Sequence, residues 1–134
     1  MRKIVYTYGV FDMIHPGHIR ILQKAKALGD YLIVGVVGDE AVEDLKGVGR
    51  PVQSLRARME MVAEFKSVDK VVEQETYDPT VNILRIQPDV LTKGDDWDYI
   101  PGQDMMHEIH GEFVSLPYSQ DYSSTRLIER IKCL

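Results

Sequence analysis

Short apolar segments alternate with longer segments of helical periodicity along this chain, and this alternation limits the folds that it can adopt. Residues 31–37 carry the strongest signal, because they are apolar throughout, as expected of a strand buried on both faces of a sheet. The predicted strands are residues 3–8, 31–37, 68–72, 90–92 and 112–116, and the predicted helices are residues 17–28, 39–45, 55–65, 78–86, 103–109 and 125–132. Strands that alternate with helices predict one α/β domain, residues 1–134, with a doubly wound parallel sheet of about five strands.

Composition and charge argue against several classes of protein. At 134 residues, 44% hydrophobic and 28% charged, the chain has the size and composition of one globular domain. Its net charge of −5 argues against broad nucleic-acid binding, which needs a basic face. Arg2 and Lys3 lead into a strand instead of a signal peptide's apolar core, and no apolar stretch approaches the ~20 residues of a membrane-spanning helix. Cys133 is the only cysteine, so no intrachain disulfide forms, and we expect a cytoplasmic protein.

Two histidines follow the first predicted strand. His15 and His18 are three residues apart, with Gly17 between them, where a helix is predicted to begin. Both imidazoles are therefore expected near the helix N-terminus, where unpaired N–H groups and partial positive charge favour anions. Glycine lets the backbone approach a phosphate closely, and the imidazoles add hydrogen-bond donors. The spacing thus predicts a polyphosphate site at the carboxyl ends of the strands, where open α/β sheets bind ligands.

Residues 9–18, Gly-Val-Phe-Asp-Met-Ile-His-Pro-Gly-His, resemble the opening motif of the cytidylyltransferase-like nucleotidyltransferases. This family includes glycerol-3-phosphate cytidylyltransferase, ethanolamine-phosphate cytidylyltransferase and heptose-1-phosphate adenylyltransferase. Further segments resemble family landmarks in the same order, namely residues 28–34, residues 46–52 followed by Arg58, residues 93–97 and residues 123–126. The resemblance covers the chain from residue 3 to about residue 131, and it implies a Rossmann-like fold.

The resemblance implies four basic catalytic residues, His15, His18, Lys46 and Arg58, which stabilise the charge that develops at the α-phosphate of a nucleoside triphosphate. Arg58 is preferred to Arg56 and Arg50, two nearby residues of the same type. The resemblance also implies a nucleotide-binding set from the segments that follow the strands. These residues are Gly9, Val10, Phe11, Asp12, Gly17, Gly94, Asp95, Asp96, Trp97, Ser123, Ser124 and Thr125.

Several members of this set have two candidate roles. Asp12 is expected either to orient a histidine or to help hold Mg²⁺, and we favour orientation because one carboxylate makes a poor metal site. Trp97 either shields the site or stacks on the base. Residues 123–125 cap a predicted helix and also offer hydroxyl groups to a phosphate. In the glycerol-3-phosphate branch this last motif begins with arginine and contains glycine, whereas this chain has Tyr118 and Asp121 there.

Two branches of the family compete for the reaction. Residues 95–97 and 116–117 resemble the glycerol-3-phosphate cytidylyltransferases, whereas residues 46–52 resemble the heptose-phosphate adenylyltransferases. We favour transfer of CMP from CTP to a polyol or sugar phosphate, with glycerol 3-phosphate as the first acceptor and pyrophosphate as the leaving group. The alternatives are a heptose-1-phosphate adenylyltransferase using ATP, an FAD synthetase-like adenylyltransferase and a non-catalytic nucleotide-binding module. The resemblance also implies Mg²⁺ bound through the nucleotide phosphates, with no metal site built from protein ligands alone, and a homodimer.

Overall fold

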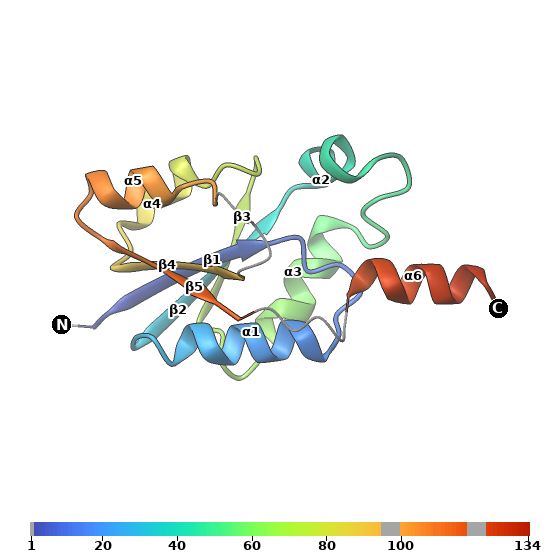
Figure 1. Ribbon diagram of the computed structural model, residues 1–134, viewed down its shortest axis with the longest axis horizontal. Helices are drawn as coiled ribbons and strands as arrows, with labels where there is room; N and C mark the ends of the chain where they lie inside the picture. The colour runs from blue at the N-terminus through green and yellow to red at the C-terminus, as the bar shows by residue number, and fades with distance from the viewer. Residues whose placement is uncertain (1, 95–99, 118–122) are drawn as a thin grey trace.

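Five parallel strands form one sheet at the centre of the structure, a computed structural model that describes residues 2–94, 100–117 and 123–134 (Figure 1). The strands are β1 (Ile4–Gly9), β2 (Tyr31–Val37), β3 (Lys70–Gln74), β4 (Val90–Gly94) and β5 (Glu112–Leu116). Their order in the sheet is β3-β2-β1-β4-β5, and every neighbouring pair is parallel. The helices are α1 (Pro16–Lys26), α2 (Asp39–Lys46), α3 (Leu55–Ala63), α4 (Thr80–Ile86), α5 (Gln103–Glu108) and α6 (Ser124–Lys132). The doubly wound, Rossmann-like architecture that was predicted is confirmed.

Helices cover both faces of the sheet, because successive strand residues alternate between two apolar cores. In β1, Val5 packs in the core that includes buried residues of α1 and α3, whereas Tyr6 packs in the core that includes buried residues of α4 and α5. In β2, Leu32 and Ile33 divide between the same two cores. Figure 1 shows α1 and α3 on one side of the sheet and α4 and α5 on the other. The central strands are therefore buried on both faces, as the apolar run at residues 31–37 predicted.

Some element boundaries differ from the prediction for local reasons. β3 begins at residue 70 instead of 68, because the Asp69 side chain, and not a backbone carbonyl, accepts the Leu32 N–H at this end of the strand. The Asp69 N–H donates to the Leu32 carbonyl at 3.0 Å, and the Leu32 N–H donates to the Asp69 carboxylate at 2.8 Å. α4 begins with Pro79 at its N-cap instead of Asp78. The Asp78 carboxylate nevertheless accepts the Thr80 N–H at 2.9 Å, so it caps the first turn as its side chain predicted.

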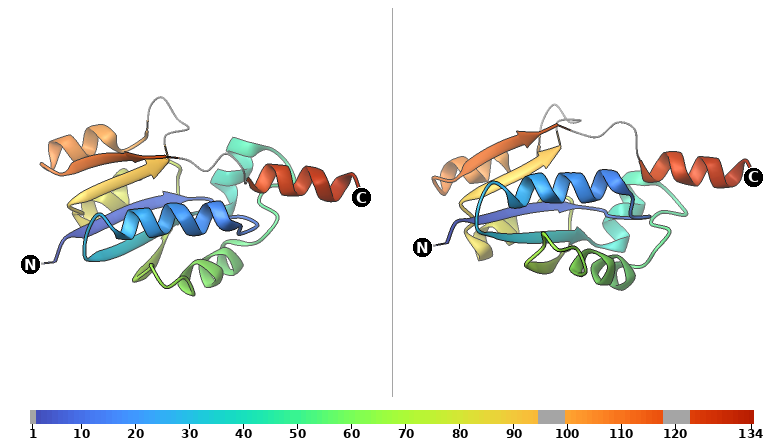
Figure 2. Two further views of the ribbon diagram at one scale, coloured as in Figure 1. Left: turned by 60° about the horizontal axis from the view of Figure 1, so that its bottom comes forward. Right: turned by 90° about the horizontal axis from the view of Figure 1, so that it is seen from below.

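The carboxyl edge of the sheet receives the loops that carry most of the predicted site. β1, β2 and β4 all end at this edge, and the N-terminus of α1 follows β1 there. α6 begins beside the loop after β1 and extends away from the rest of the domain, as Figures 1 and 2 show. None of its described residues is buried. Among the described helices, none has the length and apolar content needed to cross a membrane.

Candidate active site

A cavity of about 200 Å³ lies at the carboxyl edge, where the loop after β1, the N-terminus of α1 and the end of β4 meet. It brings together most of the predicted site residues that the structure describes, namely Gly9, Val10, Phe11, Asp12, His15, His18, Lys46, Gly94, Ser124 and Thr125. Gly17, Ser123 and Arg58 are also described but are not part of the cavity wall. Asp95, Asp96 and Trp97 lie outside the described residues, as do Tyr118 and Asp121.

The two histidines are oriented by the backbone of their own turn. His15 is the N-cap of α1, and its Nδ1 accepts the Gly17 N–H at 3.1 Å. The Nδ1 of His18 accepts the His15 N–H at 3.2 Å, which completes a reciprocal capping box. The ring centroids are 3.9 Å apart. Because an Nδ1 that accepts a hydrogen bond carries no proton, each neutral ring holds its proton on Nε2.

Both histidines are held in the neutral form. Burial, with smaller contributions in the same direction from His15, Lys46 and Lys93, lowers the pKa of His18 to about 3. Burial also lowers the pKa of His15. At neutral pH the site therefore presents two uncharged imidazoles, each with an Nε2–H donor. Such donors stabilise phosphate oxygens by hydrogen bonding without taking up a proton first.

Two lysines supply positive charge to the same cavity. Lys46 is the last residue of α2, and its position on the cavity wall agrees with the prediction. Lys93 lies near the end of β4 and was not among the predicted catalytic residues. Its Nζ donates to the Tyr8 carbonyl at 2.8 Å and lies 4.5 Å from the centroid of the Tyr8 ring. The one charged residue of a short strand, immediately before a glycine, was the sequence signal that could have identified it.

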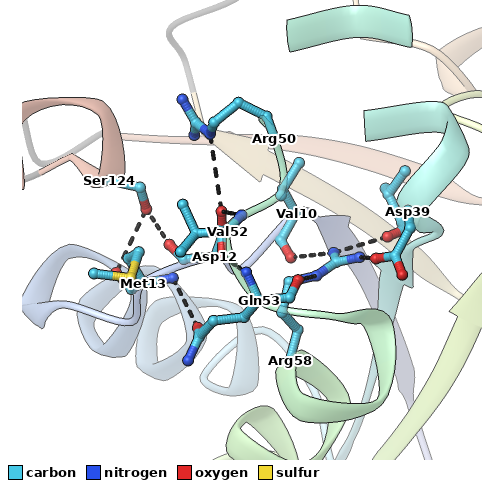
Figure 3. A network of polar contacts seen from close by, with 10 residues as sticks. Val10, Asp12, Met13, Asp39, Arg50, Val52, Gln53, Arg58 and Ser124 are labelled. Atoms are coloured by element: carbon cyan, nitrogen blue, oxygen red, sulfur yellow. Dashed lines mark hydrogen bonds and ion pairs between the residues drawn. The ribbon is translucent and has the colours of Figure 1, made fainter. Parts of the chain in front are cut away.

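Asp12, in the loop after β1, binds the loop that connects α2 to α3, as Figure 3 shows. Its carboxylate is 1% exposed and accepts the Val52 N–H at 2.7 Å and the Gln53 N–H at 3.0 Å. The Gln53 side chain in turn accepts the Met13 N–H at 3.1 Å. The contacts of Asp12 are with backbone N–H groups and give no support to the role of orienting a histidine, which stays a prediction. The Asp12 carboxylate joins the loop after β1 to a segment about forty residues later.

Arg58 is part of the framework beneath the site and does not reach the cavity. Its side chain is fully buried, and Nη1 donates to the carbonyls of Val10 and Val37, both at 2.8 Å. Its Nε donates to the Gln53 carbonyl at 3.0 Å, and its Nη2 pairs with Asp39 at 2.6 Å. The predicted contact between Arg58 and nucleotide phosphates therefore needs correction. In this structure the guanidinium joins the ends of β1 and β2 to the α2–α3 loop (Figure 3).

The N-terminus of α6 is attached to the loop after β1. The Ser123 hydroxyl accepts the Arg126 N–H at 3.0 Å, which confirms the predicted cap. The Ser124 hydroxyl donates to the Asp12 carbonyl, and a second contact reaches the Met13 carbonyl at 3.5 Å. Ser124 and Thr125 line the cavity, so the serine and threonine cluster both caps a helix and forms part of the site.

Metal ligands are sparse in the described part of the site. No group of three or more histidine, cysteine or acidic side chains within the described ranges is arranged to hold a metal ion. The one carboxylate that the described residues place on the cavity wall, that of Asp12, already accepts two backbone N–H groups. The imidazole and ammonium groups on the cavity wall suit phosphate oxygens better than a cation.

Comparisons with known proteins show the family of the chain. A family model described as cytidylyltransferase-like matches residues 6–130. The chain is 47% identical over 133 residues to the bifunctional protein HldE of Methylococcus capsulatus (strain ATCC 33009 / NCIMB 11132 / Bath), with 97% of this chain and 28% of the relative aligned. It is 41% identical over 132 residues to bifunctional protein HldE of Alcanivorax borkumensis (strain ATCC 700651 / DSM 11573 / NCIMB 13689 / SK2), with 97% of this chain aligned. The chain thus spans 28% of the length of both relatives.

Solved structures show the same architecture. The lipopolysaccharide core biosynthesis protein from Thermoplasma volcanium GSS1 superposes with a TM-score of 0.78 at 26% identity, and the match covers 90% of this chain and 100% of that one. Pantothenate synthetase from Thermus thermophilus superposes with a TM-score of 0.59 at 14% identity, over 86% of this chain and 55% of that one. The second likeness is one of fold alone.

Proposed function

Because the chain belongs to the cytidylyltransferase-like family, we propose that it is a nucleotidyltransferase that transfers AMP from ATP to a sugar phosphate of the heptose 1-phosphate type and releases pyrophosphate. The nucleotide and the acceptor differ from the CTP and glycerol 3-phosphate that the sequence favoured. Two observations support the change. Residues 46–52 resemble the heptose-phosphate adenylyltransferases, and we take the HldE proteins as relatives from that branch.

The observation that carries the proposed chemistry is the arrangement of donors in the cavity. His15, His18, Lys46 and Lys93 come from three separate elements and line one cavity at the carboxyl edge. Two are neutral N–H donors and two are cationic. A triphosphate carries several negative charges close together, and this combination of hydrogen bonds and charge complements them. The adjoining N-terminus of α1 contributes the positive end of a helix dipole.

The proposed reaction is an in-line displacement at the α-phosphorus. An oxygen of the acceptor phosphate forms a new bond to the α-phosphorus, and the bond from that phosphorus to the α–β bridging oxygen breaks. The bond electrons leave with pyrophosphate, so the products are an ADP-linked sugar and pyrophosphate. No base is needed, because the acceptor phosphate is already an anion at neutral pH. The Nε2–H groups of His15 and His18, with the ammonium groups of Lys46 and Lys93, stabilise the charge that develops on the phosphoryl oxygens.

We further propose that Mg²⁺ enters the site with the nucleotide. When bound there, Mg²⁺ neutralises charge on the phosphates and favours departure of pyrophosphate. The chain's own contribution is a set of donors around the phosphates. A homodimer also remains a proposal, supported by the family resemblance and by the exposed final helix.

A nucleotide panel tests the proposed function directly. Thermal melting with ATP, CTP, GTP and UTP, each with Mg²⁺, identifies the nucleotide that stabilises the fold. Release of pyrophosphate is then measured with heptose 1-phosphate, glycerol 3-phosphate and FMN as acceptors. We expect ATP to give the largest stabilisation and heptose 1-phosphate to give turnover. Turnover with only CTP and glycerol 3-phosphate would contradict the branch assignment. Stabilisation without turnover for any pair would support a binding module.

A further inference from the structure

The two arginines of the α2–α3 region, Arg50 and Arg58, differ in how the described chain uses their donors. Arg58 was expected at the phosphates but donates to three backbone carbonyls and pairs with Asp39. Arg50, which ranked below it, has donors that the described part of the protein leaves unused. We propose that Arg50 is the arginine that binds the polyphosphate ligand of this site. This inference rests on the proposed function for the identity of the ligand, because a nucleoside triphosphate supplies the phosphate oxygens.

The first observation is that two buried nitrogen atoms of the Arg50 guanidinium lack a hydrogen-bond partner among the described residues. Its Nε and Nη2 atoms are buried, and neither makes a hydrogen bond with any residue that the structure describes. Its ion-pair partner is Asp12, at 3.9 Å from Nε to Oδ2, which is too long for a hydrogen bond. The Asp12 carboxylate already accepts N–H groups from Val52 and Gln53. Buried N–H groups in folded proteins are almost always paired, so this guanidinium is set up for an acceptor that the described chain does not itself supply.

The second observation is that Arg50 lies next to residues of the cavity wall, although Arg50 itself lines the neighbouring groove and not the cavity. Asp12, its ion-pair partner, lines the cavity, and so does Lys46, which lies four residues before Arg50. Ser124, another cavity residue, donates to the Asp12 carbonyl. Figure 3 shows the Arg50 guanidinium beside the Asp12 carboxylate and directed away from Arg58. Arg50 therefore lies among residues that already form the wall of the predicted phosphate site.

The charge distribution indicates which side of Arg50 an anion approaches. Arg50 lines a second groove together with Asp39, Glu40 and Glu43, whose carboxylates repel a polyphosphate. The neighbouring cavity, whose wall includes the Arg50 partner Asp12, contains Lys46 and Lys93. An anionic ligand is therefore expected on the cavity side. There a planar guanidinium can donate two parallel N–H groups to phosphate oxygens, a geometry that an ammonium group cannot reproduce.

The loop that carries Arg50 has room to adjust around a ligand. Gly47 and Gly49 have φ values of 97° and 88°, a region that favours glycine, and a Cβ atom at either position would meet no described atom within 4 Å. The loop is fixed at its far end, where Val52 and Gln53 bind Asp12. A small movement about the two glycines can thus bring the guanidinium to the phosphates without disturbing the Asp12 contacts.

The test measures binding of inorganic tripolyphosphate by calorimetry, so that it needs neither base recognition nor turnover. We compare the wild type with Arg50→Gln, Arg50→Lys and the control Arg56→Gln, whose side chain is 92% exposed. Loss of a charge-assisted fork should weaken binding by about tenfold or more in Arg50→Gln, and Arg50→Lys should recover only part of it. Arg56→Gln should bind like the wild type.

Thermal melting separates a ligand role from a structural one. Because Arg50→Gln removes one 3.9 Å ion pair with Asp12 and no hydrogen bond from the buried Nε and Nη2 to a described residue, the variant should melt close to the wild-type temperature. Wild-type binding of tripolyphosphate by both Arg50 variants would overturn the inference and leave the proposed function intact. A melting temperature lowered by several degrees in both variants, with weakened binding in both, would assign Arg50 a structural role and would also overturn it. A wild type that binds neither tripolyphosphate nor any nucleotide would contradict the proposed function itself.

Discussion

The Nδ1 atom of His18 accepts the backbone N–H of His15 at 3.2 Å, and this bond links the chemistry of the site to the start of α1. His15 makes the matching bond to the Gly17 N–H. The same two contacts cap the helix and place the proton of each ring on Nε2. A short motif thus determines the helix start, the ring orientation and the tautomer together, which explains the three-residue spacing of the two histidines.

We predict that Lys93 contributes to turnover as a cationic group. Lys93→Met should lower turnover by at least about tenfold, because it removes a charge from the phosphate site, and Lys93→Arg should retain part of the activity. The control is Lys70→Met, an exposed lysine at the start of β3. Lys93→Met should also raise the pKa of His18 toward its ordinary value, because the Lys93 charge helps to lower it. NMR titration of the imidazole checks this shift, and an unchanged His18 pKa with full turnover would contradict the role.

The stability of the fold should decrease as pH falls from about 6.5. His18 has a folded-state pKa of about 3, below its ordinary value of 6.5, so the unfolded chain binds a proton that the folded chain does not. The contribution of neutral His18 to the free energy of unfolding is complete above pH 6.5. It is lost as pH falls toward 3, at up to about 1.4 kcal/mol per pH unit. His18→Asn should remove this component of the slope. Urea unfolding at several pH values measures it, and an identical slope in the variant would contradict a neutral His18 with a lowered pKa.

Arg58→Met should lower the free energy of unfolding. The molecules that remain folded should bind tripolyphosphate nearly as well as the wild type. The change leaves the buried carbonyls of Val10, Val37 and Gln53 without their donor, at a cost of a few kcal/mol in the free energy of unfolding. Chemical denaturation of Arg58→Met and of the exposed control Arg56→Gln gives the comparison. A variant of wild-type stability with lost phosphate binding would restore Arg58 to the catalytic set.

The final helix should support a homodimer. α6 has no buried residue in the described structure, although Leu127, Ile128 and Ile131 are apolar and spaced for one helix face. Light scattering should give twice the chain mass of 15.3 kDa at micromolar concentration. Ile131→Glu should shift the distribution toward the monomer, whereas the exposed Lys132→Glu should not. A monomeric wild type across that concentration range would contradict the expectation.

The fold and the centre of the site could be predicted because their signals are local. The apolar run at residues 31–37 requires a buried strand, and the histidine spacing after the first strand requires only a helix start to bring the rings together. Arg58 could not be placed in this way, because a charged residue on a helix is ordinarily exposed. Its burial depends on carbonyls from β1, β2 and the α2–α3 loop, which only the tertiary structure brings together.

The partner of Asp12 was unpredictable for the same reason. Its carboxylate accepts N–H groups from Val52 and Gln53, a contact between loops about forty residues apart. No spacing within the first motif contains that information. The position of Arg50 depends in turn on its ion pair with Asp12. Only the loop conformation could therefore indicate whether Arg50 or Arg58 is available to a ligand. Lys93 was visible as an isolated charge in a buried strand, but its position in the cavity follows from the order of strands in the sheet.

The central claim is that neutral histidine N–H groups promote nucleotidyl transfer, and phosphorus NMR tests it most directly. The wild type is incubated with ATP, Mg²⁺ and heptose 1-phosphate, beside His18→Asn, whose side-chain oxygen can still accept the His15 N–H but lacks the Nε2–H. We predict diphosphodiester signals and free pyrophosphate for the wild type, and a rate lowered by at least about a hundredfold for a folded His18→Asn. Full activity in His18→Asn would contradict the mechanism, and no pyrophosphate from any nucleotide with any phosphate ester would contradict the proposed transferase.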